Sequence, residues 1–457
     1  MARVGIVICN YNRAEMVCKC IESVLESRYT DYKLFVVDNA STDDSVRAVR
    51  EHFGARAQLV LNSENMGGSG GFNAGMRRVL AENDMSCGGG GYEYIWCLDN
   101  DVLVDENALG VLVEFLDAHP ECGMAGSKVD HMEAPDYVQQ YGLTIDFEHF
   151  CTVAKYRNHP EDGTLPEVVY SDAAAACSLL VRCSVIVGEI GLMPEDNFLY
   201  WDDTEWGYRC NLAGYKVASC GRSVVLHAMG AKGEDADNIP AYYAWRNGIH
   251  FFVRYTPKER LDVMCRSFLQ GVFDVLYEGM YRNETGRAGT VMAAYDDALH
   301  GVRGKAAENR IYPADARDNR LRGILEGKKC ALIEAGNHAD DAEILAGKIS
   351  ALFPQMEVEI LYSGQKNAPA HRDQDAAATV VFCMCGFLFD QEDLSLSKIY
   401  ADQNGNFLAT EEDALMVIHY PYSRRMFFGG QMPLFLRCAA ELRGRDTQRE
   451  GRDRKKT

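Results

Sequence analysis

Two aspartates separated by one residue, Asp99 and Asp101, follow the apolar segment 93–98. Where a strand turns into a loop, two such carboxylates can reach one divalent cation. Hard carboxylate oxygens are the ligands that Mg²⁺ and Mn²⁺ prefer. Aspartate is also common in turns, so the triplet alone favours an ordinary turn. Its interpretation as a metal site depends on the rest of the sequence.

A second acidic cluster, Asp202, Asp203 and Glu205, opens an amphipathic helix that we expect to end near Ala213. A carboxylate in this position can take a proton from a reacting hydroxyl. The alternative is a surface helix with acidic residues in its first turn. The neighbouring Trp201 fits equally well as a sugar-stacking ring or as a residue that packs at the helix entry.

The segments between these clusters alternate between strand and helix. Short apolar runs at 4–9, 33–38, 57–62 and 93–98 predict buried parallel strands, and residues 14–27 and 73–82 have helical spacing. This alternation predicts an α/β fold with a parallel sheet. Asp38 then ends one strand and Asp99 and Asp101 follow another, at the carboxyl ends where open α/β sheets bind ligands.

The rest of the chain predicts further units. Residues 242–284 are helical with an interruption at Thr256-Pro257, and residues 303–323 are polar and basic. A strand at 329–335, a helix at 340–353 and strands at 356–362 and 379–385 indicate a smaller α/β unit. We therefore predict a catalytic domain at 1–255, a helical segment and linker at 256–327, an accessory α/β domain at 328–442 and a basic disordered tail at 443–457.

The composition excludes several classes of protein. With 67 acidic and 47 basic residues the net charge is −20, so the chain lacks the basic footprint of a nucleic-acid binder. The 16 cysteines are scattered, as expected of reduced thiols in a cytoplasmic protein. The N-terminus lacks the features of a signal peptide, and no apolar run reaches the length of a transmembrane helix.

The order of the motifs resembles the family 2 glycosyltransferases, in the branch that holds galactofuranosyl- and rhamnosyltransferases. The resemblance covers about residues 1–250, and its motifs are the segments 10–13 (NYNR), 36–43 (VVDNASTD), 65–72 (NMGGSGGF), 98–101 (LDND) and 201–209 (WDDTEWGYR), followed by His227. Asn100 departs from a common all-acidic form of the fourth motif but leaves both outer carboxylates in place.

The resemblance implies a GT-A fold, a nucleotide-diphosphate sugar donor, a divalent metal and inversion at the anomeric carbon. It assigns Asp203 as the catalytic base, and Trp201, Asp202 and Glu205 are the candidate substrate contacts. The remaining predicted site residues are the donor contacts Asn12, Asp38, Gly70, Gly71 and Asp99 and the metal ligands Asp99, Asp101 and His227.

The predicted function is transfer of a sugar, galactofuranose or rhamnose first, from a UDP- or dTDP-linked donor to a hydroxyl of a cell-surface glycan or lipid-linked acceptor, with Mn²⁺ or Mg²⁺. The alternatives are an inactive nucleotide-sugar or glycan-binding scaffold and a nucleotidyltransferase-like enzyme. We expect a cytoplasmic protein. We leave open a peripheral contact with the inner face of the membrane, through the tail or the apolar segments 426–428 and 434–436. Homo-oligomerisation is also left open.

Overall fold

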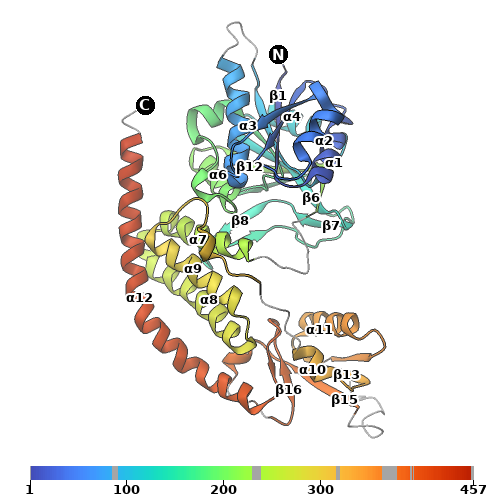
Figure 1. Cartoon of the computed structure of the whole chain (residues 1–457), viewed down its shortest axis with the longest axis vertical. Coiled ribbons are helices and arrows are strands. Elements are labelled where there is room, and N and C mark those ends of the chain that lie inside the picture. Colours follow the sequence, from blue (N-terminus) through green and yellow to red (C-terminus); the bar gives the residue numbers. More distant parts are fainter. Residues whose placement is uncertain are drawn as a thin grey trace. The chain divides into compact units, whose positions relative to one another are not determined.

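The computed structural model describes residues 2–84, 91–228, 238–314, 320–362, 378–391, 394 and 396–453. The chain divides into two compact units, each with its own sheet (Figure 1). Unit 1 comprises Met1–Ser267, Ala293–Ile311 and Cys438–Thr457. Unit 2 comprises Phe268–Met292 and Tyr312–Arg437.

The sheet of unit 1 has the strand order β10-β12-β6-β11-β4-β1-β2-β3, with β5 beside β12 and β7 beside β6. Strands β4, β1, β2 and β3 are parallel, as are β6 and β12, and the antiparallel strand β11 joins these two parts. The predicted α/β architecture is confirmed. The strands are β1 (Val4–Asn10), β2 (Tyr32–Asp38), β3 (Ala57–Leu61), β4 (Tyr94–Asp99), β5 (Val102–Val104), β6 (Cys122–His131), β7 (Ala134–Gln140), β10 (Val168–Ser171), β11 (Ser178–Arg182) and β12 (Lys216–His227), and β8 (Leu143–Asp146) pairs with β9 (Cys151–Ala154) in a separate ribbon.

Helices cover both faces of this sheet, because its central strands are apolar on both sides. Ile6 and Ile8 of β1 pack with residues of α1 (Ala14–Leu25), α2 (Ser45–Phe53) and α4 (Ala108–Ala118). Val7, on the opposite face, packs with α3 (Gly67–Asp84) and α6 (Asp202–Leu212). Figure 1 shows these helices around β1.

The structure corrects one local expectation. Helix α3 begins at Gly67, six residues before the predicted helix 73–82, and therefore contains most of the glycine-rich motif 65–72. Strand β12 has a register shift between Cys220 and Val224 where it pairs with β6.

A helical region follows unit 1's sheet, as the sequence predicts. It contains α7 (Ile239–Tyr255), α8 (Leu261–Arg282) and α9 (Thr285–His300). The short helix α5 (Cys183–Val185) does not belong to this region, because it follows β11. The break between α7 and α8 falls at Thr256-Pro257, because proline cannot donate a backbone hydrogen bond.

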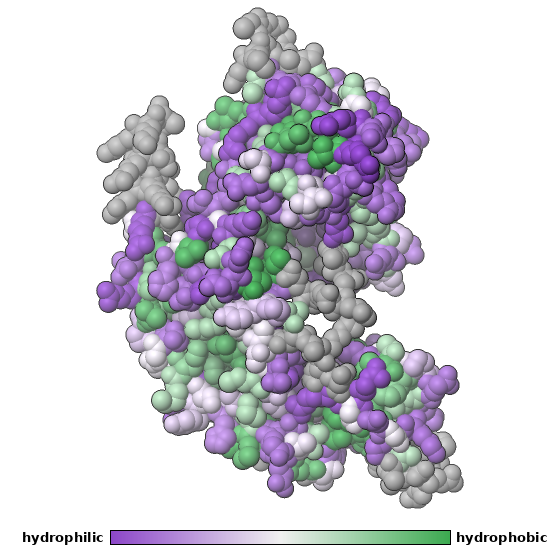
Figure 2. Space-filling view, in the orientation of Figure 1, coloured by the Kyte–Doolittle hydropathy of each residue, from purple (hydrophilic) through white to green (hydrophobic). Residues whose placement is uncertain are grey.

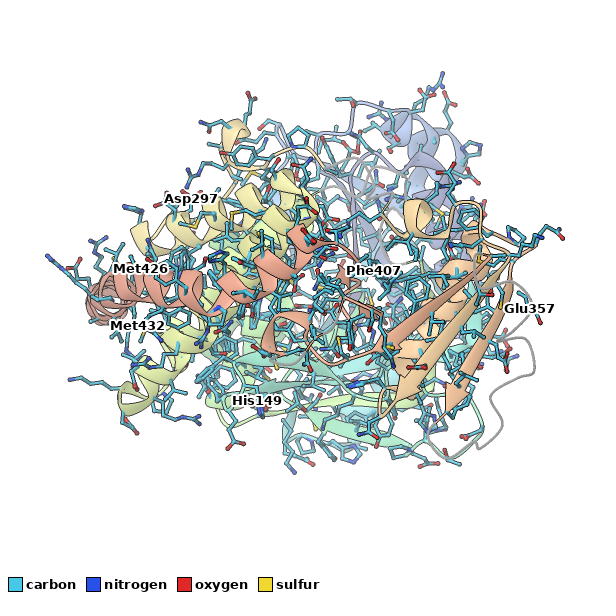
Figure 3. The ribbon with its side chains drawn as sticks, turned by 90° about the horizontal axis from the view of Figure 1, so that it is seen from below. His149, Asp297, Glu357, Phe407, Met426 and Met432 are labelled. Atoms are coloured by element: carbon cyan, nitrogen blue, oxygen red, sulfur yellow. The ribbon has the colours of Figure 1, made fainter. Side chains whose placement is uncertain are left out.

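Unit 2 contains the predicted smaller α/β structure. Strands β14 (Glu357–Tyr362), β13 (Cys330–Gly336), β15 (Thr379–Met384) and β16 (Ile399–Ala401) are parallel in that order, and β17 (Phe407–Leu408) is antiparallel to β16. Figure 3 labels Glu357 and Phe407 on this sheet. Helices α10 (Arg320–Leu325) and α11 (Ala339–Leu352) pack on it.

The last helix, α12 (Glu411–Asp453), extends into the segment for which the sequence predicts a disordered tail. Arg443, the first residue of that segment, donates a hydrogen bond to the Val253 carbonyl oxygen at 2.9 Å. Among the described residues, no helix combines the length and the hydropathy needed to cross a membrane. On the face shown in Figure 2, hydrophobic residues form small groups between hydrophilic ones.

Candidate active site

The carboxyl ends of β1, β2 and β4 meet at one edge of the unit 1 sheet. The parallel register places Asn10 opposite Asp38 and Cys9 opposite Asp99. The Asn10 side chain donates a hydrogen bond to Asp38 Oδ1 at 3.5 Å and accepts one from Asn100 Nδ2 at 2.8 Å. Asn100, the residue that departs from the all-acidic motif, therefore links the aspartate turn to the neighbouring strands.

Asp99, Asp101 and His227 form a cluster of potential metal ligands. Strand β12 pairs with β5 so that His227 lies opposite Val102, next to the aspartate turn. His227 Nε2 lies 3.2 Å from Asp101 Oδ1 and 3.9 Å from Asp99 Oδ2, and one ligand atom from each residue lies within 4.8 Å of the others. Two carboxylates and one imidazole suit Mn²⁺ or Mg²⁺, so these residues fit the predicted metal.

The charges in this cluster shift the protonation of its members. Burial and the nearby Asp101 raise the pKa of Asp99 to about 7. Burial alone would raise the pKa of Asp101, but the hydrogen bond and the charge of His227 lower it below its ordinary value. A divalent cation would relieve the repulsion between the two carboxylates, because it favours their charged forms.

Gln139 of β7 orients the histidine, and no motif in the sequence points to this role. Its Oε1 lies 2.7 Å from His227 Nδ1, and its Nε2 donates to the His227 carbonyl oxygen at 3.4 Å. Because Oε1 is an acceptor, we assign the Nδ1 proton to this hydrogen bond. Nε2 is then the nitrogen directed at the two aspartates, as a metal-ligating histidine requires.

We expect Gln139→Leu to weaken Mn²⁺ binding by about 10- to 100-fold, because the imidazole loses the acceptor that fixes its orientation. Gln139→Glu keeps an acceptor at this position and is expected to retain binding. Titration calorimetry with Mn²⁺ measures both. Equal affinities in wild type and Gln139→Leu would show that the ring is positioned by other contacts.

The predicted donor residues lie around the end of β2. Asp38 is buried, and its Oδ2 accepts a hydrogen bond from the Ser41 backbone N–H at 2.9 Å. Asn12 has a positive φ of 51°, and its side-chain oxygen accepts from the Thr42 backbone N–H at 2.7 Å. The two loops that follow β1 and β2 are thus held together beside Asp38.

Asn39, which the sequence analysis did not select, holds the start of α3. Its side chain donates to the Gly67 carbonyl oxygen at 2.8 Å and accepts from the Met66 backbone N–H at 3.0 Å. The position directly after Asp38 was the only available signal. The backbone N–H groups of the first turn of α3 are consequently fixed relative to the end of β2.

The glycines of the first turns of α3 allow the helix to approach the sheet closely. A Cβ atom at Gly71 would lie 2.2 Å from Cys9 Sγ, and one at Gly70 would lie 2.6 Å from Met66 Cβ. Their demonstrated role is therefore close packing. Their predicted contact with the donor stays a prediction.

We expect Gly71→Ala to lower the free energy of unfolding of unit 1 by about 1–3 kcal/mol, because the new methyl group overlaps Cys9 Sγ. All four tryptophans lie in unit 1, so their fluorescence during urea unfolding follows this unit. Gly110→Ala in α4 is the matched control, since its Cβ would lie 3.8 Å from the nearest atom. Adding Cys9→Ala should recover part of the loss. If Gly71→Ala is as stable as wild type, the packing explanation is wrong.

Asp202 and Asp203 begin α6 and differ in their surroundings. Asp203 Oδ2 accepts a hydrogen bond from the Ala176 backbone N–H at 3.2 Å, and its Oδ1 accepts from the Thr204 N–H at 2.6 Å. Asp202 Oδ2 faces the first turn of α3, 3.6 Å from where a Cβ on Gly68 would lie. Both carboxylates are half-buried.

The two aspartates are electrostatically connected to the metal cluster. Burial and the charge of Asp203 raise the pKa of Asp202 to about 8. Burial also raises the pKa of Asp203, and the backbone N–H groups of Ala176 and Thr204 oppose that shift. Asp203 accepts the Ala176 N–H, and the carbonyl oxygen of the next residue, Cys177, accepts the Asp99 N–H at 3.3 Å, so the structure brings α6 and the aspartate turn to the same site.

Glu205 and Trp201 point towards α7. The buried Glu205 accepts hydrogen bonds from Arg254 and Tyr255, each at 3.1 Å. Trp201 Nε1 donates to the Ala244 carbonyl oxygen at 3.0 Å, and its ring lies 5.1 Å from that of Phe251. These contacts tie α6 to α7. They favour helix packing over sugar stacking for Trp201, whereas the neighbouring Tyr200 is exposed.

Comparison with known proteins assigns the N-terminal part of the chain. Residues 5–164 match the model of Glycosyl transferase family 2. The galactofuranosyltransferase GlfT2 of Mycolicibacterium smegmatis is 22% identical over 269 residues, 54% of this chain and 40% of that protein. GlfT2 of Mycobacterium tuberculosis is 24% identical over 254 residues, 50% of this chain and 38% of that protein. The aligned part is thus about two fifths of these relatives' length.

A solved structure gives a weaker likeness. The mannosyltransferase PcManGT from Pyrobaculum calidifontis, in complex with GDP-Man and Mn²⁺, aligns with a TM-score of 0.39 and 19% identity, covering 55% of this chain and 63% of that one. The family match and the galactofuranosyltransferase relatives agree with the motifs in residues 10–101. Residues 5–164 of the chain therefore form a family 2 glycosyltransferase domain, and the curated relatives that align with about half of the chain include two galactofuranosyltransferases.

Proposed function

We propose that this protein transfers a sugar from a UDP- or dTDP-linked donor to a hydroxyl group of a glycan or lipid-linked acceptor, with inversion at the anomeric carbon. Galactofuranose is the first candidate sugar, because the relatives that align over half of the chain are galactofuranosyltransferases. Rhamnose is the second. The observation that carries the proposal is the convergence of Asp99, Asp101 and His227 with the aspartates of α6 at one edge of the sheet.

The donor is assigned to the ends of β1, β2 and β4. We assign Asp38 to the base of the donor, and Asp99, Asp101 and His227 would hold Mn²⁺ or Mg²⁺ beside the diphosphate. When bound, the metal ion would stabilise the negative charge that develops on the leaving diphosphate. The Gln139 side chain keeps His227 in the orientation that this binding needs.

Asp203 is the proposed general base. The acceptor hydroxyl forms a new C–O bond at the anomeric carbon while the bond to the diphosphate oxygen breaks and the nucleoside diphosphate leaves with the bonding electrons. The Asp203 carboxylate takes the hydroxyl proton during this step. Its hydrogen bonds to Ala176 and Thr204 fix its position, and burial raises its pKa towards that of an effective base. A single displacement of this kind inverts the anomeric configuration.

A thermal-shift screen of nucleotide sugars with and without Mn²⁺ tests the ligand assignment. A donor at 100 times its dissociation constant should stabilise the folded protein by about 2.7 kcal/mol. We expect the largest shift for one uridine- or thymidine-linked sugar in the presence of Mn²⁺, and no shift for that sugar with Asp101→Ala. Equal shifts with and without metal would contradict the proposal.

We also propose a cytoplasmic location. The described cysteines are free thiols, and this agrees with a reducing compartment. The alternative of an inactive binding scaffold predicts donor binding without turnover, so release of nucleoside diphosphate separates the two functions.

A further inference from the structure

One face of α12 presents large apolar side chains that are exposed among the described residues of unit 2. Leu415, Ile418, Tyr422 and Met426 are all exposed, and Ile418 and Met426 have exposed fractions of 69% and 62%. Their spacing of three and four residues places them in one row along a helix. Figure 3 labels Met426 on this helix. We call these four residues the outer row.

The opposite face of α12 already has a partner. Val417 and Tyr420 are buried, and they pack with Phe273 and Tyr277 of α8 and with Phe389. The Tyr420 hydroxyl also donates a hydrogen bond to Asp274. Because these contacts hold the helix in place, the outer row is not needed to attach α12 to unit 2.

The charge of α12 differs from that of the whole protein. The chain has a net charge of −20, yet residues 414–440 contain no aspartate or glutamate. The same stretch contains His419, Arg424, Arg425 and Arg437, and each of these is exposed. An apolar row beside cationic side chains, on a helix of low overall hydropathy, is the pattern of a helix that lies in a membrane interface.

We propose that the outer row of α12 binds the surface of an anionic lipid bilayer, with its apolar side chains at the headgroup boundary. Arginine side chains beside the row would contact the lipid phosphates. A second copy of this chain fits this face less well. A two-fold interface would place Arg425 of each copy near the same cationic face of the other.

The test uses the full chain and sedimentation with vesicles, without any nucleotide sugar, so that its outcome is independent of the proposed catalysis. The vesicles contain either phosphatidylcholine alone or phosphatidylcholine and phosphatidylglycerol at about 3:1. We expect binding to the anionic vesicles only, and weaker binding in high salt. Absence of binding to the anionic vesicles would overturn the proposal.

Three variants of α12 and one control variant identify the surface. The double variant Ile418→Ser/Met426→Ser should weaken binding at least tenfold, because two apolar side chains no longer enter the bilayer. Arg425→Ser should weaken it about fivefold, and Arg425→Lys should restore it. The matched control Val187→Ser/Leu212→Ser changes two apolar residues of unit 1 that are 72% and 62% exposed, and it should bind like wild type.

Two further results would contradict the proposal, one from the control variant and one from the oligomeric state of the protein without vesicles. Equal losses of vesicle binding in the outer-row double variant and in the control variant would mean that the outer row is not the contact. A wild-type dimer that Ile418→Ser/Met426→Ser converts to a monomer without vesicles would assign this face to a second copy instead. Arg425→Ser decides the question if the double variant does not fold, because a single exposed arginine is replaced.

Discussion

Replacing Asp203 with asparagine should reduce the rate of sugar transfer by about 10²- to 10⁴-fold, which is the usual contribution of a general base. The substitution removes the basic charge and keeps the size of the side chain. Donor affinity should change little, because Asp203 is assigned to the acceptor hydroxyl. Turnover measured at saturating donor, with calorimetry for donor binding, gives both quantities.

Asp202→Asn is the matched control, since it changes the neighbouring carboxylate in the same way. Burial and the charge of Asp203 raise the pKa of Asp202 to about 8, so Asp202 is largely protonated at neutral pH and is a poor proton acceptor there. We therefore expect a smaller loss for Asp202→Asn. If Asp202→Asn abolishes turnover and Asp203→Asn does not, the base is the preceding residue. If neither substitution matters, the acceptor is activated elsewhere.

The Asp203→Asn substitution also changes the hydrogen bonds that hold this side chain. Both oxygens of Asp203 accept backbone N–H groups, one from Ala176 and one from Thr204. An asparagine amide would place an NH₂ group against one of these donors. Thermal unfolding of the variant should accompany the kinetics, so that a loss of catalysis is distinguished from a loss of structure.

Removing the metal site should have an effect of similar size. Asp101→Ala removes a carboxylate that lies 3.2 Å from His227 Nε2, and we expect a loss of about 10³-fold in transfer. This corresponds to about 4 kcal/mol of transition-state stabilisation at 1.36 kcal/mol for each factor of ten. Chelation of the wild-type protein should cause a comparable loss, and added Mn²⁺ or Mg²⁺ should reverse it.

The matched variant for this prediction is Asp105→Ala, which removes an aspartate that follows β5 and lies outside the ligand cluster. Asp105 Oδ1 accepts hydrogen bonds from Asn107 and makes no contact with His227 among the described residues. Its loss should leave metal dependence unchanged. Full activity of the wild type in excess chelator would contradict the metal assignment.

Much of the architecture was predictable because its cause is local in the sequence. The buried strands of unit 1 are continuous apolar runs, and Asp38 and Asp99 are the last residues of two of them. Parallel pairing then brings their ends together without further information. In unit 2, β13, β14, β15 and α11 were predicted within one or two residues for the same reason, whereas the short strands β16 and β17 were not predicted.

Features that depend on contacts between distant segments were not predictable. Gln139 contacts His227 from β7, a strand in a region that the sequence shows only as irregular. Glu205 was selected as a neighbour of Asp203, but its carboxylate turns to Arg254 on α7, 49 residues further along the chain. Neither partner can be identified from residue types or spacing.

The long helix α12 escaped prediction for a different physical reason. Pro421 and Pro433 lie inside it, and proline ordinarily ends a helix because it lacks a backbone N–H and clashes with the preceding turn. Both prolines are exposed, so the carbonyl groups that lose their partners can be hydrated. Packing of Val417, Tyr420 and Phe435 supplies the stability that local propensity lacks.

The reaction products of the purified protein test the central claim most directly. The protein is incubated with Mn²⁺ and a set of UDP- and dTDP-sugars, and the nucleotide products are separated by chromatography. We predict release of the nucleoside diphosphate, lost in excess chelator and reduced at least 100-fold by Asp203→Asn. Formation of a nucleoside monophosphate with sugar 1-phosphate or of pyrophosphate, or tight donor binding with no product at all, would contradict the assignment of this site to sugar transfer.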